Sequence, residues 1–210
     1  MEESNRTHPV RLKGELTDTP SRGLWLVKWL LIVPHLIILA GLAVAFAVLT
    51  VIAFFAILFT GTYPRRLFDF NVGVLRWGWR VSFYSYGALG TDTYPPFTLK
   101  GLDYPADLEI PYPEKLKNGL VLVKWFLAIP HYAALAALTG WAAGNAAGWS
   151  PPFVGLLCVL VIVVAVLLLF TGKYHRDIFG LIMGIQRWSY RVIAYVALMT
   201  DEYPPFRLRE

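Results

Sequence analysis

The chain has 210 residues, of which 57% are hydrophobic and only 16% are charged. A soluble domain typically has about 25% charged residues, so this composition argues against an ordinary soluble protein. We interpret the net charge of +5 as the Lys and Arg excess that membrane proteins carry on their cytoplasmic side, and as attraction to anionic lipid. We therefore expect a phospholipid bilayer, and no nucleic acid, as a partner.

The N-terminal segment, residues 1–22, is polar and charged. It has no apolar stretch in front of a small-residue cleavage site, which a secretory signal would require. We predict that this segment is a short cytoplasmic tail.

The first apolar run follows, and residues 29–64 contain no Asp, Glu, Lys or Arg. Uncharged apolar runs longer than about 18 residues indicate membrane spans. One helix over residues 24–59 would be about 54 Å long, against about 30 Å for the hydrocarbon core. We predict a transmembrane helical hairpin over residues 24–60 with a tight turn near Gly41. The alternative is a helix lying flat over residues 24–33, followed by a single span over residues 35–59.

A segment with two arginines comes next, at residues 68–89. On a helix, Arg76 and Arg80 lie on one narrow stripe, and the rest of the surface is apolar and aromatic. Each arginine would cost about 2.5–3.5 kcal/mol at the centre of a span. We therefore predict an amphipathic helix that lies in the membrane interface, with Trp77 at headgroup depth. Residues 100–118 mix acids, bases and prolines, and predict an irregular cytoplasmic linker.

The second half of the chain repeats the first. Residues 23–35 match residues 119–131, and residues 59–65 match residues 170–176. The extra residues of the second half fall around residues 139–152, which read as a loop.

From these matches we predict two repeats, residues 23–99 and 119–210. The second contains a hairpin over residues 120–171 with a lengthened turn, and an interfacial amphipathic helix over residues 179–199. Because the hairpin tips carry no charge, the positive-inside rule places both termini and the linker on the cytoplasmic side. The predicted fold is thus an all-α membrane protein of two tandem parallel repeats, related by a pseudo-twofold axis along the membrane normal.

The arginines allow two interpretations. They snorkel, or pair with backbone carbonyls and acids such as Asp69 within the fold, or else they bind an anionic lipid headgroup through bidentate contacts. Under the second interpretation the candidate headgroup-binding residues are Arg76, Arg80, Arg187, Arg191, Trp77 and Trp188.

A histidine follows a proline at equivalent places in both halves, His35 after Pro34 and His131 after Pro130. A structural interpretation is that each imidazole donates to a carbonyl that the proline leaves free. The functional alternatives are axial ligation of a haem b iron by the two imidazoles, and a proton relay. The sequence contains no metal-ligand cluster and no complete catalytic motif, so we predict no metal and no catalytic residue.

Four motifs occur in the same order in both halves: Trp-x4-Pro-His, Thr-Gly-x-Tyr, Arg-Trp-x2-Arg-Val and Thr-Asp-x-Tyr-Pro-Pro-Phe. In these motifs the chain resembles the domain of unknown function 4389 family, over roughly residues 23–99 and 119–208. The resemblance implies a bacterial membrane protein without an established activity. The second half departs from the first where Gly180 and Ile182 replace Asp69 and Asn71.

We therefore expect a non-enzymatic accessory or scaffold subunit of a larger membrane assembly, with other membrane protein subunits as partners and anionic-lipid contacts through its arginine stripes. One alternative is a small transporter or channel with a path at the repeat interface. The other is a haem protein ligated by His35 and His131. The expected location is the bacterial inner membrane, as a multi-pass protein with both termini in the cytoplasm.

Overall fold

The computed structural model describes residues 8–17, 20–140 and 155–208 of the chain. Within these ranges the protein is mostly helical. In chain order the elements are β1 (Arg11–Gly14), α1 (Trp25–Leu31), α2 (Val33–Thr60), α3 (Arg65–Tyr84), β2 (Ala106–Glu109), α4 (Leu120–Leu127), α5 (Ile129–Thr139), α6 (Leu156–Thr171) and α7 (Arg176–Val196).

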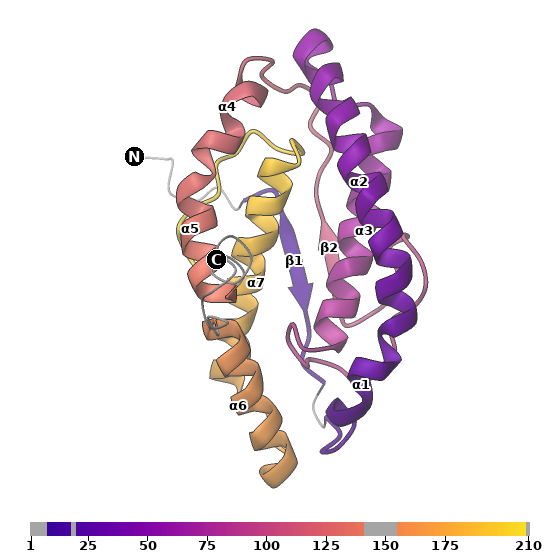
Figure 1. Ribbon diagram of the computed structural model, residues 1–210, viewed down its shortest axis with the longest axis vertical. Helices are drawn as coiled ribbons and strands as arrows, with labels where there is room; N and C mark the ends of the chain where they lie inside the picture. Colours follow the sequence, from indigo (N-terminus) through magenta and orange to yellow (C-terminus); the bar gives the residue numbers. More distant parts are fainter. Residues whose placement is uncertain (1–7, 18–19, 141–154, 209–210) are drawn as a thin grey trace, which may run out of the picture.

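The elements form three layers (Figure 1). The outer layer contains α1 and α2 from the first half, and α4, α5 and α6 from the second half. The middle layer contains α3, which packs on α2, and α7, which packs on α4, α5 and α6. The third layer, the strand layer, is the antiparallel pair of β2, which packs on α3, and β1, which packs on α7. The middle layer is therefore covered on both sides.

The first apolar segment forms one long helix, so the predicted hairpin over residues 24–60 is wrong. α2 continues for 28 residues through Gly41, around which there is open space. A glycine inside a helix costs only about 1 kcal/mol relative to alanine, which is too little to create a turn. The helix is instead interrupted at Ile32, because Pro34 is tolerated only in the first turn of the helix that it begins. The alternative prediction, a short helix followed by a long one, matches the observed bounds.

In the second half the counterpart of α2 is divided into α5 and α6. The two ends meet, because a Cβ atom built on Gly155 would lie 2.2 Å from the backbone nitrogen of Gly140. Figure 1 shows α6 continuing along the line of α5 rather than folding back beside it. The predicted hairpin over residues 120–171 therefore does not form, although most of its predicted turn lies outside the described residues. The twelve residues from Ile129 to Gly140 and the sixteen of α6 make up the length of α2.

The two long helical segments run in opposite directions (Figure 1). Phe54, near the end of α2, stacks on Trp125 at the start of the second half, with ring centroids 5.5 Å apart. The linker causes this reversal, because Asn118, directly before α4, donates a 3.0 Å hydrogen bond to the carbonyl of Leu58 near the end of α2. The second half thus begins where the first long helix ends, and the predicted parallel arrangement is wrong.

The arginine-bearing helices form the middle layer of the fold. α3 and α7 overlap the predicted ranges 68–89 and 179–199 but begin three residues earlier. Trp79 on α3 is fully buried and contacts Tyr190 on α7, with ring centroids 5.6 Å apart. On α3 the arginine stripe faces the strand layer, where Arg76 and Arg80 contact Asp107, and the interfacial position of these helices stays a prediction.

The strand pair was not predicted. β1 lies in the segment predicted to be a tail, and β2 lies in the predicted irregular linker. The register pairs Leu12 with Leu108 and Arg11 with Glu109. Both leucines are buried while Arg11 and Glu109 are exposed, which is the alternation expected of strands with one covered face.

Candidate functional site: an apolar outer face and a central cleft

The exposed surface of α1, α2, α4, α5 and α6, here named the outer face, is apolar. Its large side chains are well exposed, with Ile37 at 70% and Val44 at 66%. The stretches Val33–Thr60 and Leu120–Thr139 are long and apolar enough to cross a membrane. In their most apolar 18 residues, only 11% and 22% of the residues are buried. The core helix of a soluble protein would be mostly buried instead. The outer face is thus suited to hydrocarbon rather than to water.

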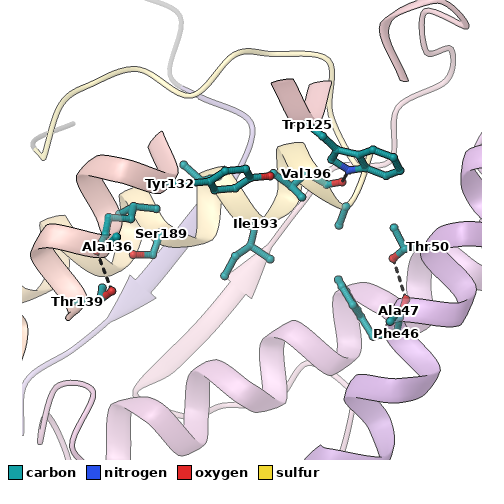
Figure 2. Close-up of a pocket in the computed structure, with 13 residues that line it drawn as sticks. Phe46, Ala47, Thr50, Trp125, Tyr132, Ala136, Thr139, Ser189, Ile193 and Val196 are labelled. Atoms are coloured by element: carbon teal, nitrogen blue, oxygen red, sulfur yellow. Dashed lines mark hydrogen bonds between the residues drawn. The ribbon is translucent and has the colours of Figure 1, made fainter. Parts of the chain in front are cut away.

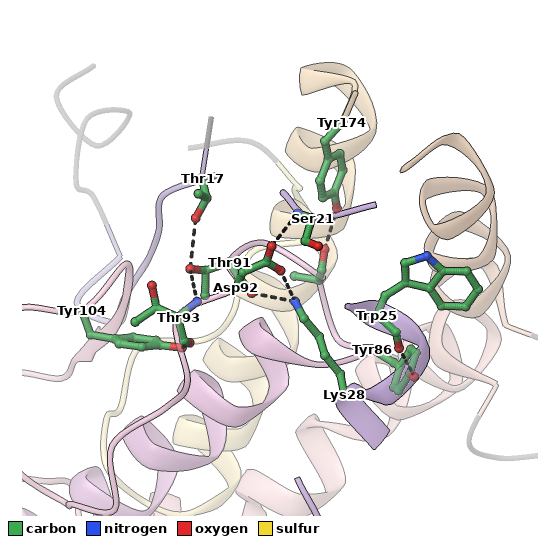
Figure 3. Close-up of polar contacts among 11 residues, drawn as sticks. Thr17, Ser21, Trp25, Lys28, Tyr86, Thr91, Asp92, Thr93, Tyr104 and Tyr174 are labelled. Carbon is green, nitrogen blue, oxygen red and sulfur yellow. Dashed lines mark hydrogen bonds and ion pairs between the residues drawn. The ribbon is translucent and has the colours of Figure 1, made fainter. Parts of the chain in front are cut away.

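Two lysines interrupt the apolar outer helices, and both turn inward. Lys28 on α1 is 2% exposed. Its ammonium lies 2.9 Å from the Asp92 carboxylate and donates to the Thr91 carbonyl at 2.7 Å (Figure 3). It also lies 4.5 Å from the centre of the Tyr84 ring. Burial lowers the pKa of Lys28, and its hydrogen bond and charge interaction with Asp92 oppose this effect.

Lys124 on α4 makes the same contacts in the second half. It is fully buried, lies 2.7 Å from Asp201 and donates to the Thr200 carbonyl at 2.7 Å. These pairs remove both positive charges from the outer face and attach the loop after each middle helix to the outer layer. The sequence analysis missed these pairs, although a lysine within an apolar run and a Thr-Asp pair occur in both halves and could have indicated them.

Arg76 and Arg80 hold the strand layer in place. Arg80 is fully buried, and its guanidinium lies 3.1 Å from Asp107 and 2.9 Å from the Lys100 carbonyl. Arg76 lies 3.0 Å from the same carboxylate and donates to the Leu108 carbonyl at 3.0 Å. Burial lowers the pKa of Arg80, and Asp107 opposes this effect. In the first half the structure therefore contains the intramolecular pairing, with Asp107 as the acid, whereas the expected Asp69 pairs with Arg65 at the surface.

In the second half, Arg191 is 5% exposed and Arg187 is half-buried on α7. Both have partners within the chain. Trp77 and Trp188 are also buried, at 5% and 6% exposure, so neither lies at an exposed position in the described fold. The headgroup-binding role of these residues stays a prediction.

The two histidines lie in equivalent aromatic cages. The Trp77 indole donates to Nδ1 of His35 at 3.1 Å, and the Trp188 indole donates to Nδ1 of His131 at 3.2 Å. The imidazoles stack on Phe97 and on a second phenylalanine, Phe206, at 3.9 and 4.0 Å. Because Nδ1 accepts, the neutral ring carries its proton on Nε2, and both Nε2 atoms are buried without a hydrogen-bond partner among the described residues.

This geometry does not bring the two histidines into one site. Each ring is enclosed by aromatic side chains of its own half, Trp77, Tyr94 and Phe97 for His35. Among the described residues, no group of three or more His, Cys, Asp or Glu side chains could hold a metal ion. Neither the haem nor the relay interpretation gains a shared site from these contacts.

A cleft of about 910 Å³ opens on the outer face between the two halves (Figure 2). α2 forms one wall, α4 and α5 form the other, and α7 forms the floor. The residues that line it are Phe46, Ala47, Thr50, Trp125, Tyr132, Leu135, Ala136, Thr139, Ser189, Val192, Ile193, Val196 and Ala197. This set contains no charged side chain, so the cleft extends the apolar surface into the interior.

Comparison with known protein families identifies the chain. A family model described as a domain of unknown function (DUF4389) matches residues 22–98 and 153–207, in two segments that together cover more than half of the chain. The chain belongs to this family. The first DUF4389 segment includes α1, α2 and α3, and the second includes α6 and α7. No curated protein and no solved structure matches the chain.

Proposed function

We propose that this DUF4389 protein is a non-enzymatic membrane protein, embedded through its outer face, that serves as an accessory or scaffold subunit for other membrane proteins. The observation that supports it most directly is the distribution of charge between the layers. The outer face exposes large apolar side chains and keeps Lys28 and Lys124 inside. The strand layer exposes charged residues, among them Lys13 and Glu15 at 64% and 66%.

We further propose that the molecule lies sideways in the bilayer. Figure 1 places the strand pair midway along the long helices. If these helices crossed the membrane end to end, the charged side chains of the strand layer would lie at the depth of the hydrocarbon. Each would then cost about 3 kcal/mol. Sideways immersion leaves the strand layer in water, and this arrangement replaces the multi-pass topology in the proposal.

The role as a subunit is supported by the structural use of the buried charged residues and the histidines. The buried charges hold the loops and the strand layer, and each histidine is held by the aromatic residues of its own half. A rigid body with one apolar and one charged face can dock partners at both surfaces. Neither the transporter path nor the haem site has such support, so neither is part of the proposal.

Flotation with vesicles tests the membrane contact. The purified protein should float with phosphatidylcholine and phosphatidylglycerol vesicles, and Val44→Lys combined with Val51→Lys should reduce the floated fraction several-fold. The matched control is Glu15→Gln with Glu109→Gln, which makes the same change in net charge but on the strand layer, and should leave flotation unchanged. A protein that stays in solution without detergent or vesicles would contradict the proposal.

The sideways orientation has its own test in two single-cysteine variants, each in a Cys158→Ala background. Thr62 and Lys173 are exposed and follow the ends of α2 and α6, which lie at opposite ends of the molecule (Figure 1). In sealed vesicles, an impermeant maleimide should label Thr62→Cys and Lys173→Cys from the same side. Labelling of one from outside and of the other only after lysis would show that the long helices cross the bilayer.

A further inference from the structure

The cleft between the halves is a feature that membrane contact alone does not require. Its walls come from α2 in the first half and α5 in the second, and its floor comes from α7 in the middle layer. From Ile182 to Val196 the other residues of α7 are buried or half-buried, yet Ile193 is 38% exposed because the cleft opens onto it. A surface meant only for packing against bulk lipid would not need this access to the middle layer.

The polar groups of the lining are already satisfied by their own helices. The Thr50 hydroxyl donates to the Phe46 carbonyl, the Thr139 hydroxyl to the Leu135 carbonyl and the Ser189 hydroxyl to the Ile185 carbonyl, at 2.8 to 2.9 Å. Apart from Tyr132, the lining therefore presents hydrocarbon and aromatic surface. An occupant with charges or several hydrogen-bonding groups would lose its hydration there without replacement.

We propose that the cleft is a binding site for an acyl chain of a bilayer phospholipid. This inference rests on the proposed membrane contact, because the cleft opens on the outer face and is continuous with it. The volume of about 910 Å³ lies within the roughly 300–1,000 Å³ of small-molecule sites. In a bilayer the uncharged molecules that adjoin such an opening are lipid chains, which match the lining in polarity and reach the floor without a headgroup entering.

The site would hold one lipid in a fixed place between the halves. The acyl chain enters the cleft from the surrounding hydrocarbon and lies over α7, while the headgroup stays outside the cleft. Tyr132 and Trp125, which line the walls, are 42% and 41% exposed and lie against the chain. The bound lipid would thus seal the gap between α2 and α5.

Photo-crosslinking with a phosphatidylcholine that carries a diazirine on its acyl chain tests this site. The full chain is reconstituted in vesicles of that lipid diluted into plain phosphatidylcholine, and adducts are mapped by peptide mass spectrometry. Adducts are expected on the cleft floor at Ile193 and its neighbours on α7, in addition to adducts on the outer face at Val44 and Val51.

Two neighbouring substitutions on α5 provide a matched pair. Ala136 lines the cleft, whereas Ala137 is exposed on the same helix outside the lining. Ala136→Phe fills the cleft and should reduce the α7 adducts at least fivefold, with the outer-face adducts unchanged. Ala137→Phe should change neither. A second filling variant on the opposite wall, Ala47→Phe, repeats the measurement should Ala136→Phe fail to fold.

The outcomes separate the two proposals. Adducts on the outer face without adducts on α7 overturn the lipid site and leave the membrane contact intact. No adducts on either surface overturn both. Adducts on α7 that persist at the same level in both filling variants also overturn the site, because the label would then reach α7 by another route.

Discussion

The outer helices of the two halves differ in continuity, although they have the same length. α2 runs unbroken from Val33 to Thr60, whereas its counterpart stops at Gly140 and resumes at Leu156. Both are held in the same way. A short helix with a buried lysine precedes each of them, and each packs on a helix of the middle layer. The comparison teaches that an insertion into an apolar run does not mark a turn of the helix. When the helix is supported along one side, its two parts stay in line.

The largest expected effect concerns the buried ion pairs Lys28–Asp92 and Lys124–Asp201. It tests whether the two pairs stabilise the protein equally. Lys28→Met and Lys124→Met should each lower the free energy of unfolding by about 3 kcal/mol, because each takes the ammonium partner away from a partly buried aspartate and from a backbone carbonyl. Chemical unfolding in detergent micelles measures the loss. Adding Asp92→Asn to Lys28→Met should recover part of it. A loss in one half only would show that the halves are held differently.

The next prediction concerns a deletion that makes the outer helix of the second half resemble that of the first. Deleting residues 141–155 and changing Gly140→Ala joins α5 to α6 with the residue count of α2. Because a loop of this length need no longer be closed, the free energy of unfolding should rise by about 2 kcal/mol. Circular dichroism should show a higher helical fraction. A protein that no longer folds would mean that the inserted residues support the second half.

A third prediction concerns the N-terminal segment, which His8 connects to the second half. Burial, together with the charges of Arg191 and Arg207, lowers the pKa of His8 from 6.5 to about 4. Between these values the unfolded chain binds more protons than the folded one, so the stability falls as the pH is lowered through this window. We expect a loss of about 1–2 kcal/mol from pH 7 to pH 4, after allowance for solvent screening.

The measurement for His8 is the difference between the wild type and His8→Gln, which cannot titrate. Carboxylates also titrate near pH 4. Subtracting the stability of the variant from that of the wild type removes their contribution. The two proteins should diverge below pH 6.5 and not above it. Parallel curves throughout would show that His8 is solvated in the folded protein.

The smallest effect distinguishes a continuous α2 from a hairpin. Gly41 lies in the middle of α2 with no neighbour within 4 Å of a Cβ atom built on it. Gly41→Ala should therefore raise the free energy of unfolding by about 0.5–1 kcal/mol. A tight turn at this position would give the opposite sign, since alanine would be strained there.

Local patterns in the sequence predicted the helices well. The apolar runs and the arginine-bearing segments correspond to observed helices, with bounds shifted by a few residues, although the first run forms α1 and α2 rather than a hairpin. The direction of the second half could not be predicted, because it depends on Asn118 meeting the end of α2, a contact between residues 60 positions apart. The hairpin error came from comparing helix length with bilayer thickness, an argument that applies only to a helix that stands upright in the membrane.

The candidate site was predicted less well. Arg80 looked like a lipid ligand because its acid, Asp107, lies in a linker segment too short to be recognised as a strand. Conversely, the cleft could not be foreseen, because Ala47, Ala136 and Ile193 are ordinary apolar residues until the fold sets them around one space. Spacing within one helix predicts which residues share a face. It does not predict what that face meets.

The placement of β1 has a consequence for the order of assembly. β1 is made first, but its strand partner β2 emerges nearly a hundred residues later, and α7, on which it packs, is among the last elements made. A nascent chain leaving the ribosome must therefore keep β1 unpaired until β2 has been made. β1 is enclosed only when α7 arrives, so a late cooperative step of folding joins these two elements.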